Sequence, residues 1–144
     1  MTRVDFYLLK GNTFSDQIDF CCRLTEKAFS LHPRIHIQTT ESAQSEALNS
    51  ALWSFKEDSF LPHCIGHEHK EPTPITIDSK LPLSSLSSKQ DLLISLANTI
   101  PEKVDHYQRL CLIILNIEVD IQEARKRYKE LKQLGFEVHI HDMR

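Results

Sequence analysis

A strip of basic residues near the end of the sequence has the chemistry of a binding site. Arg125, Lys129 and Lys132 recur at positions i, i+4 and i+7, so they share one side of a predicted helix. Tyr128 stands where this strip meets an apolar stripe of the same helix. Cations beside an apolar edge suit an acidic peptide that also has an aromatic anchor. The alternative is a solvated basic face next to an ordinary core.

The segment that positions this strip is predicted to be a strand, a helix and a second strand. The helix spans residues 120–134 and ends at Gly135, and the strands span residues 110–115 and 136–140. Apolar side chains spaced for one face are typical of a helix packed on a sheet. In this helix the stripe consists of Ile121, Ala124, Tyr128, Leu131 and Leu134.

A second group with chemical potential lies in the middle of the chain. His63, Cys64, His67 and His69 fall within seven positions, and nitrogen and sulfur ligands at close spacing bind zinc. The spacing matches no strong zinc pattern, and no second cysteine pair completes four ligands. A cysteine nucleophile at Cys64 also lacks an oxyanion motif. We therefore expect surface histidines, with no metal and no cofactor. A small metal-binding protein or hydrolase centred on His63–His69 is the alternative.

Composition limits the classes of protein. The 144 residues suit one domain spanning 1–144, with 40% hydrophobic and 26% charged residues. A net charge of −3 gives no broad attraction to nucleic acid or anionic lipid. No apolar run is long enough to cross a membrane, and no signal-type start is present, so we expect a cytoplasmic protein. The four cysteines form no disulfide framework, and most are expected to be buried.

The first half of the sequence predicts the fold class. Strands are expected at residues 4–9 and 34–39, and helices from a cap near Ser15 and Asp16 to about Leu31 and over residues 41–54. Strand, helix, strand and helix with short links favour parallel pairing. We therefore expect an α/β fold: a single three-layer α/β/α domain with a mostly parallel central sheet. The apolar helix sides would be Ile18, Cys21, Cys22, Leu24, Ala28, Phe29 and Leu31, and Ala47, Leu48, Ala51 and Leu52.

The turn after the first strand separates this fold from nucleotide-binding relatives of the same class. The turn from Lys10 to Thr13 contains one glycine, and the whole chain contains three. A dinucleotide or phosphate cradle needs a glycine-rich turn so that the backbone can approach the phosphate. The expected fold is Rossmann-like without that loop, which argues against a nucleotide-dependent enzyme.

The middle of the chain is less regular. We expect a long loop at residues 55–74, a strand at 75–78 and a mobile connection at 79–90. Residues 91–96 suit a buried strand or the start of a short helix, and residues 98–106 suit a turn leading into a short helix. An aromatic and apolar cluster begins at the end of the second helix, and either fills the core or forms a docking patch. Its members are Trp53, Phe55, Phe60, Leu61 and Pro62.

Several stretches together resemble the chi subunit of bacterial DNA polymerase III. They are VDFYLL near the start, ALWSF followed by DSFLPH at 51–63, DLLISL at 91–96, and ARKRYKELKQLGFEV at 124–138. Their order and spacing match over essentially the whole chain. None is a catalytic motif, so the resemblance rests on their combination.

The resemblance implies a non-catalytic accessory subunit of the clamp-loader assembly. Such a subunit pairs with the psi subunit, which ties it to the loader. A different surface binds the acidic C-terminal tail of single-stranded-DNA-binding protein, and that tail ends in Pro-Phe. DNA is then contacted only indirectly. An accessory repair helicase is implied to dock at the surface that psi uses.

Matched by position, the resemblance puts the tail site on the basic strip and the psi site on the aromatic cluster. The tail site would comprise Arg125, Tyr128 and Lys129, with Lys132 in support and Ile114 as an apolar neighbour. The psi site would comprise Phe60, with Trp53 and Pro62 beside it.

Two positions depart from the family pattern. Some chi sequences have a further basic residue where this chain has Ile121, which would weaken contact with the upstream acidic residues of the tail. The run Gly66–Pro72 also differs from the glycine-rich loop of relatives, so its histidines are expected to be particular to this protein.

Overall fold

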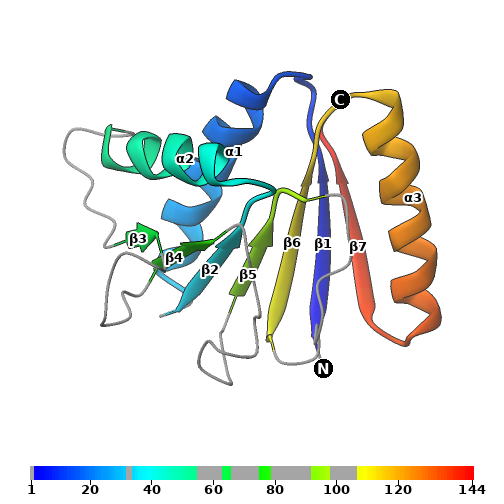
Figure 1. The fold of residues 1–144 in the computed structure, drawn as a ribbon. Coiled ribbons are helices and arrows are strands. Elements are labelled where there is room, and N and C mark those ends of the chain that lie inside the picture. The colour runs from blue at the N-terminus through cyan, green and yellow to red at the C-terminus, as the bar shows by residue number, and fades with distance from the viewer. Residues whose placement is uncertain (1, 32–33, 55–62, 66–74, 79–91, 98–106) are drawn as a thin grey trace.

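The protein folds into an α/β structure with one continuous sheet (Figure 1). The computed structural model describes residues 2–31, 34–54, 63–65, 75–78, 92–97 and 107–144. Its strands are β1 (Arg3–Leu8), β2 (Ile35–Gln38), β3 (His63–Ile65), β4 (Ile75–Asp78), β5 (Leu92–Ser95), β6 (Arg109–Ile114) and β7 (Glu137–Asp142). Its helices are α1 (Phe14–Phe29), α2 (Ser42–Ser54) and α3 (Glu118–Gln133).

The sheet has seven strands in the order β3-β4-β2-β5-β6-β1-β7. All of the strand pairings found in the described residues are parallel. This confirms the predicted class of fold. One local prediction was wrong, because β3 lies inside the segment 55–74 that was predicted as a loop. Residues 92–95 form the buried strand that was one of the two alternatives for residues 91–96.

Alternating side chains divide the sheet into two apolar faces, because successive residues of a strand point to opposite sides. On one face Ile37 and Ile113 pack with residues of α1 and α2. On the other face Phe6 and Leu112 pack with residues of α3. Figure 1 shows α3 on the opposite side of the sheet from α1 and α2. The result is the predicted three-layer α/β/α arrangement.

Helix α1 begins slightly earlier than the sequence indicated, because its cap precedes Ser15. Its N-cap is Thr13, whose hydroxyl accepts a hydrogen bond from the backbone N–H of Asp16, and Asp16 in turn accepts from the backbone N–H of Thr13. This reciprocal pair satisfies two donors that would otherwise lack partners. The prediction of a cap at Ser15 was wrong. Leu31 is 70% exposed, because α1 ends at Phe29 before the apolar face reaches it.

Helix α3 ends just before Gly135, as the glycine at this position predicted. Gly135 has φ +93°, its N–H donates to the carbonyl of Lys132, and the N–H of Phe136 donates to the carbonyl of Leu131. These two bonds form a Schellman motif. Leu134, assigned to the apolar stripe, is 64% exposed because it lies at the cap, beyond the last turn that faces the sheet. Ala47 in α2 is also exposed, contrary to prediction.

No helix among the described residues is both long and apolar enough to traverse a lipid bilayer.

Candidate functional site

A pocket of about 400 Å³ opens between α3 and the sheet. Its apolar lining comes from three elements: Phe6 and Leu8 on β1, Ile140 on β7, and one side of α3. Ile121, Ala124 and Tyr128 form the helix side of this lining. The volume lies in the range of small-ligand sites, so the pocket has room for one or two side chains of a partner.

Cations surround the pocket. Arg125 and Lys129 stand one turn apart on α3, line the pocket and are exposed to solvent. Arg144, which follows β7, supplies a third cation from another part of the chain. Among the described residues that line the pocket, Asp142 is the one carboxylate. The mouth of the pocket therefore has an excess of positive charge above an apolar floor.

The ring of Tyr128 is held in a defined position. It packs edge-on against the ring of Phe6, with centroids 6.1 Å apart. On the solvent side, Nζ of Lys132 lies 5.4 Å from the centroid of the Tyr128 ring, close enough for a cation–π contact. Tyr128 is only half-buried, so part of its ring remains available to a ligand.

Of the predicted tail-site residues, the structure brings Arg125, Tyr128 and Lys129 to one pocket. Lys132 contacts the ring of Tyr128 but does not line the pocket. Ile114 is 1% exposed and packs in the core under α3, so its side chain does not line the pocket either. The reason is that β6 lies between β5 and β1, where α3 covers it. The apolar wall of the pocket that was assigned to Ile114 is formed instead by residues of β1 and β7.

Sequence analysis missed the contribution of β1 and β7. Phe6 and Leu8 are two residues apart on β1, and Ile140 and Asp142 are two residues apart on β7. Each pair therefore shares one face of the sheet. That period was visible in the sequence. What was not visible is that β7 pairs with β1, which puts these residues beside α3.

Arg127 is a further residue that the helical wheel did not single out. It is buried, its Nε donates to the carbonyl of Glu123, and its Nη1 donates to the carbonyl of Ala97 at 3.0 Å. Its guanidinium lies 5.9 Å from the centroid of the Phe6 ring. Burial lowers the pKa of Arg127 to about 10. Arg127 thus fixes α3 on the sheet and supports the floor of the pocket.

An acidic side chain occupies the turn after β1. The Asp16 carboxylate accepts hydrogen bonds from the backbone N–H of Thr13 at 3.1 Å and from its hydroxyl at 2.7 Å. A Cβ atom at Gly11 would overlap this carboxylate. The N-terminus of α1, where related folds bind phosphate, is therefore filled by an acidic group of the protein itself.

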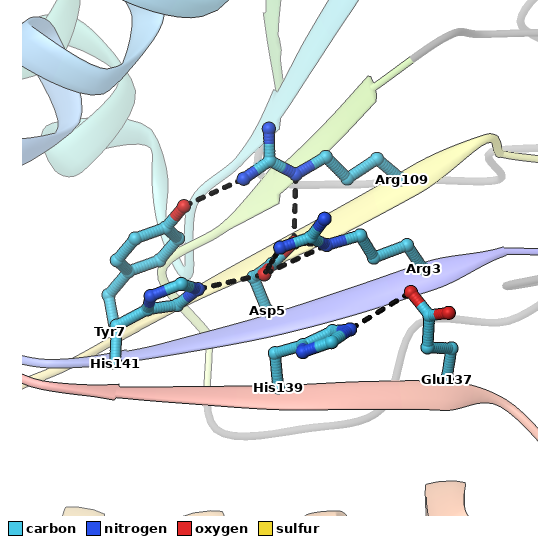
Figure 2. A network of polar contacts seen from close by, with 7 residues as sticks. All are labelled: Arg3, Asp5, Tyr7, Arg109, Glu137, His139 and His141. Atoms are coloured by element: carbon cyan, nitrogen blue, oxygen red, sulfur yellow. Dashed lines mark hydrogen bonds and ion pairs between the residues drawn. The ribbon is translucent and has the colours of Figure 1, made fainter.

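A network of polar side chains lies on the other face of β1, β6 and β7 (Figure 2). The Asp5 carboxylate is 0% exposed and accepts from Arg3, from Arg109 at 2.8 Å and from His141 at 2.8 Å. Burial alone would raise the pKa of Asp5, but these hydrogen bonds outweigh it and the pKa is lowered. Tyr7 stacks on the His141 ring and accepts from Arg109. The network satisfies the buried charge of Asp5, and at its other end the Tyr7 ring packs against Phe20 of α1.

The other predicted sites lie largely outside the described residues. Trp53 belongs to the last turn of α2, but Phe60 and Pro62 fall outside. His63 and Cys64 belong to β3, whereas His67 and His69 are outside. Within the described part of the chain, no group of three or more histidine, cysteine, aspartate or glutamate side chains is arranged to hold a metal ion.

The sequence is similar to a family of known replication proteins. The family model described as "DNA polymerase III chi subunit, HolC" matches residues 1–139. The DNA polymerase III subunit chi of Pseudomonas aeruginosa is 29% identical over 141 residues, which cover 98% of this chain and 96% of the relative. The subunit of the same name from Escherichia coli is 26% identical, with 96% and 97% covered.

Among solved structures, the chain is similar to the crystal structure of T4 UvsW, with a TM-score of 0.67 and 8% identity. The match covers 99% of this chain and 41% of that chain. At this level of identity the likeness shows a shared fold alone.

Proposed function

Since the chain belongs to the DNA polymerase III chi subunit family, which makes it a replication subunit, we propose that it is a non-catalytic adaptor of the polymerase holoenzyme. One surface would bind the psi subunit and so attach to the clamp loader. The pocket beside α3 would bind the acidic C-terminal tail of single-stranded-DNA-binding protein. The protein would act in the cytoplasm, where it links the loader to the coated template strand.

One observation supports the tail site above all: Arg125, Lys129 and Tyr128 line a single apolar pocket. The terminal phenyl group of the tail would enter the pocket against Phe6 and Ile140. Its α-carboxylate would meet Arg125, whose planar guanidinium binds a carboxylate through two parallel hydrogen bonds. The acidic residues upstream would lie along Lys129, with Lys132 beyond it.

The position of Ile121 refines this proposal. Ile121 is 8% exposed and lines the apolar part of the pocket. The chain thus has an apolar wall where some relatives have a cation. We expect stronger contact with the phenyl group and weaker contact with the upstream acidic residues.

Titration of a fluorescently labelled peptide that is acidic and ends in Pro-Phe tests the tail site. A short peptide buries little area, so we expect micromolar affinity, about −8 kcal/mol. Arg125→Ala and Tyr128→Ala should each weaken binding at least tenfold, because one removes the carboxylate partner and the other a wall of the pocket. Affinity should also fall as salt is raised.

Lys126→Ala is the matched control. Lys126 is an exposed cation on the same helix, pairs with Glu123 and does not line the pocket. Its loss should change affinity less than twofold, and thermal unfolding should show that all three variants keep the fold. Equal binding by the wild type, Arg125→Ala and Tyr128→Ala would rule out the tail site.

A further inference from the structure

One ion pair at the mouth of the pocket is formed within the protein. Nη2 of Arg144 lies 2.9 Å from Oδ2 of Asp142, and Nε of Arg144 donates to Oδ1 at 3.0 Å. The backbone N–H of Arg144 also donates to Oδ1, at 3.1 Å. Both oxygens of the carboxylate and one edge of the guanidinium are therefore engaged.

This pair occupies the position where an anionic ligand would meet a cation. Asp142 and Arg144 both line the pocket, together with Arg125 and Lys129. The side chains of Arg144 and Asp142 are 36% and 51% exposed, so an incoming anion can reach the Arg144 guanidinium. The hydrogen bonds from Arg144 lower the pKa of Asp142 to about 2. The carboxylate thus remains ionised throughout the range of pH in which replication proteins work.

We propose that Asp142 is an internal competitor for acidic peptides, holding Arg144 until a peptide carboxylate displaces it. This inference rests on the proposed tail site. Arg144 exchanges one carboxylate for another when the peptide binds, so the number of ion pairs that it makes does not rise. The negative charge left on Asp142 then repels the acidic residues of the peptide. Asp142 therefore limits affinity and favours rapid release of the tail.

Asp142→Asn tests the proposal, because it removes the charge and keeps the shape. Binding of the acidic Pro-Phe peptide should become about threefold tighter at low salt, as expected for one exposed ion pair. A peptide with its upstream acidic residues replaced by asparagine should show no such gain. Asp142→Ser serves as a second variant without the charge.

Asp19→Asn is the matched control for net charge. Asp19 pairs with Arg23 on α1, on the opposite side of the sheet from α3, so its replacement changes the total charge equally but not the pocket. We expect unchanged affinity for this variant. A gain equal to that of Asp142→Asn would show a long-range field and overturn the proposal.

A double-mutant cycle with Arg144→Ala separates competition from simple repulsion. If Asp142 acts by holding Arg144, the gain from Asp142→Asn should shrink when Arg144 is already absent. An equal gain in both backgrounds, or no gain at all, overturns the inference. Those results would leave the proposed tail site standing as long as Tyr128→Ala weakens binding at least tenfold. A wild type that binds no peptide would rule out both the tail site and this inference.

Discussion

Two buried polar residues of the sheet, Asp5 on β1 and His36 on β2, differ in whether their polar atoms have hydrogen-bond partners. Asp5 accepts hydrogen bonds from three cationic or titratable side chains. His36 on β2 is 0% exposed, and within the described residues neither of its ring nitrogens has a hydrogen-bond partner. Burial lowers the pKa of His36 to about 4. The surroundings of Asp5 stabilise its charged carboxylate, whereas the surroundings of His36 disfavour its protonated, charged ring.

His36 should make the folded protein sensitive to mild acid. Between pH 6.5 and 4 the unfolded chain binds a proton at this histidine and the folded chain does not, so stability falls as the pH falls. From pH 7 to 4.5 this one group should remove about 2 to 3 kcal/mol from the free energy of unfolding. Urea unfolding at both pH values measures the loss.

His36→Leu should flatten this dependence, because it removes the group that titrates. His139→Asn is the control, since His139 lies on an exposed part of β7 and pairs with Glu137. A profile of His36→Leu with the wild-type slope would show that other groups cause the acid sensitivity. The stabilisation from Asp5 is a separate effect, because its pKa is lowered and its contribution is lost only below about pH 4.

At the scale of the element, α3 determines the shape of the pocket, and both of its ends are defined. Glu118 and Asp120 lie in its first turn, where negative charge suits the helix dipole. Gly135 closes the last turn and directs the chain into β7. Arg127 and Leu131 are buried on the side of α3 that faces the sheet. Arg125 and Lys129 therefore lie at the mouth of the pocket.

Gly135→Ala should destabilise the protein by about 1 kcal/mol. The φ of +93° disfavours any residue with a Cβ atom, whereas the Cβ itself would meet nothing within 4 Å. The cost is therefore one of backbone conformation and not of a clash. Gly135→Asn should cost less, because asparagine tolerates left-handed conformations better than alanine. Thermal unfolding of the three proteins checks this order, and equal stability of all three would contradict it.

At the scale of the whole molecule, the proposed tail pocket lies beside α3, whereas α2, whose last turn contains Trp53, lies on the opposite side of the sheet. The other residues of the proposed psi site, Phe60 and Pro62, lie outside the described residues. If psi docks at the end of α2, as we propose, one molecule would hold both partners at once. An adaptor needs this property, because it must stay on the loader while it binds the coated template.

Phe60→Ala should separate the two proposed functions. Loss of a large aromatic anchor typically weakens an interface by more than about 2 kcal/mol. We therefore expect this variant to lose co-purification with psi and to bind the tail peptide as the wild type does. Tyr128→Ala should show the reverse pattern.

A second measurement on the psi complex checks independence. The tail peptide should bind the complex and the free protein with affinities that agree within about twofold. A much weaker affinity in the complex would mean that the two surfaces overlap or are coupled.

The sequence by itself determined the features that depend on neighbours along the chain. The spacing of Arg125, Tyr128 and Lys129 on one helix follows from local periodicity, and the stop at Gly135 follows from the freedom of glycine to adopt a positive φ. The single glycine of the turn after β1 was visible in the sequence, whereas the structure shows that the Asp16 carboxylate lies in this turn. The parallel α/β class was predicted for the same reason, since short links join successive strands and helices.

Only the tertiary structure decided which distant residues complete the pocket. Phe6, Ile140, Asp142 and Arg144 join α3 because β7 pairs with β1, a contact between opposite ends of the chain. Burial was decided in the same way: Ile114 is covered because its strand is central, while Leu134 is exposed because its helix has ended. Local periodicity predicts which side chains share a face of a helix or strand. The order of the strands in the sheet decides which other elements that face contacts. This order arises from long-range packing that no short window of sequence contains.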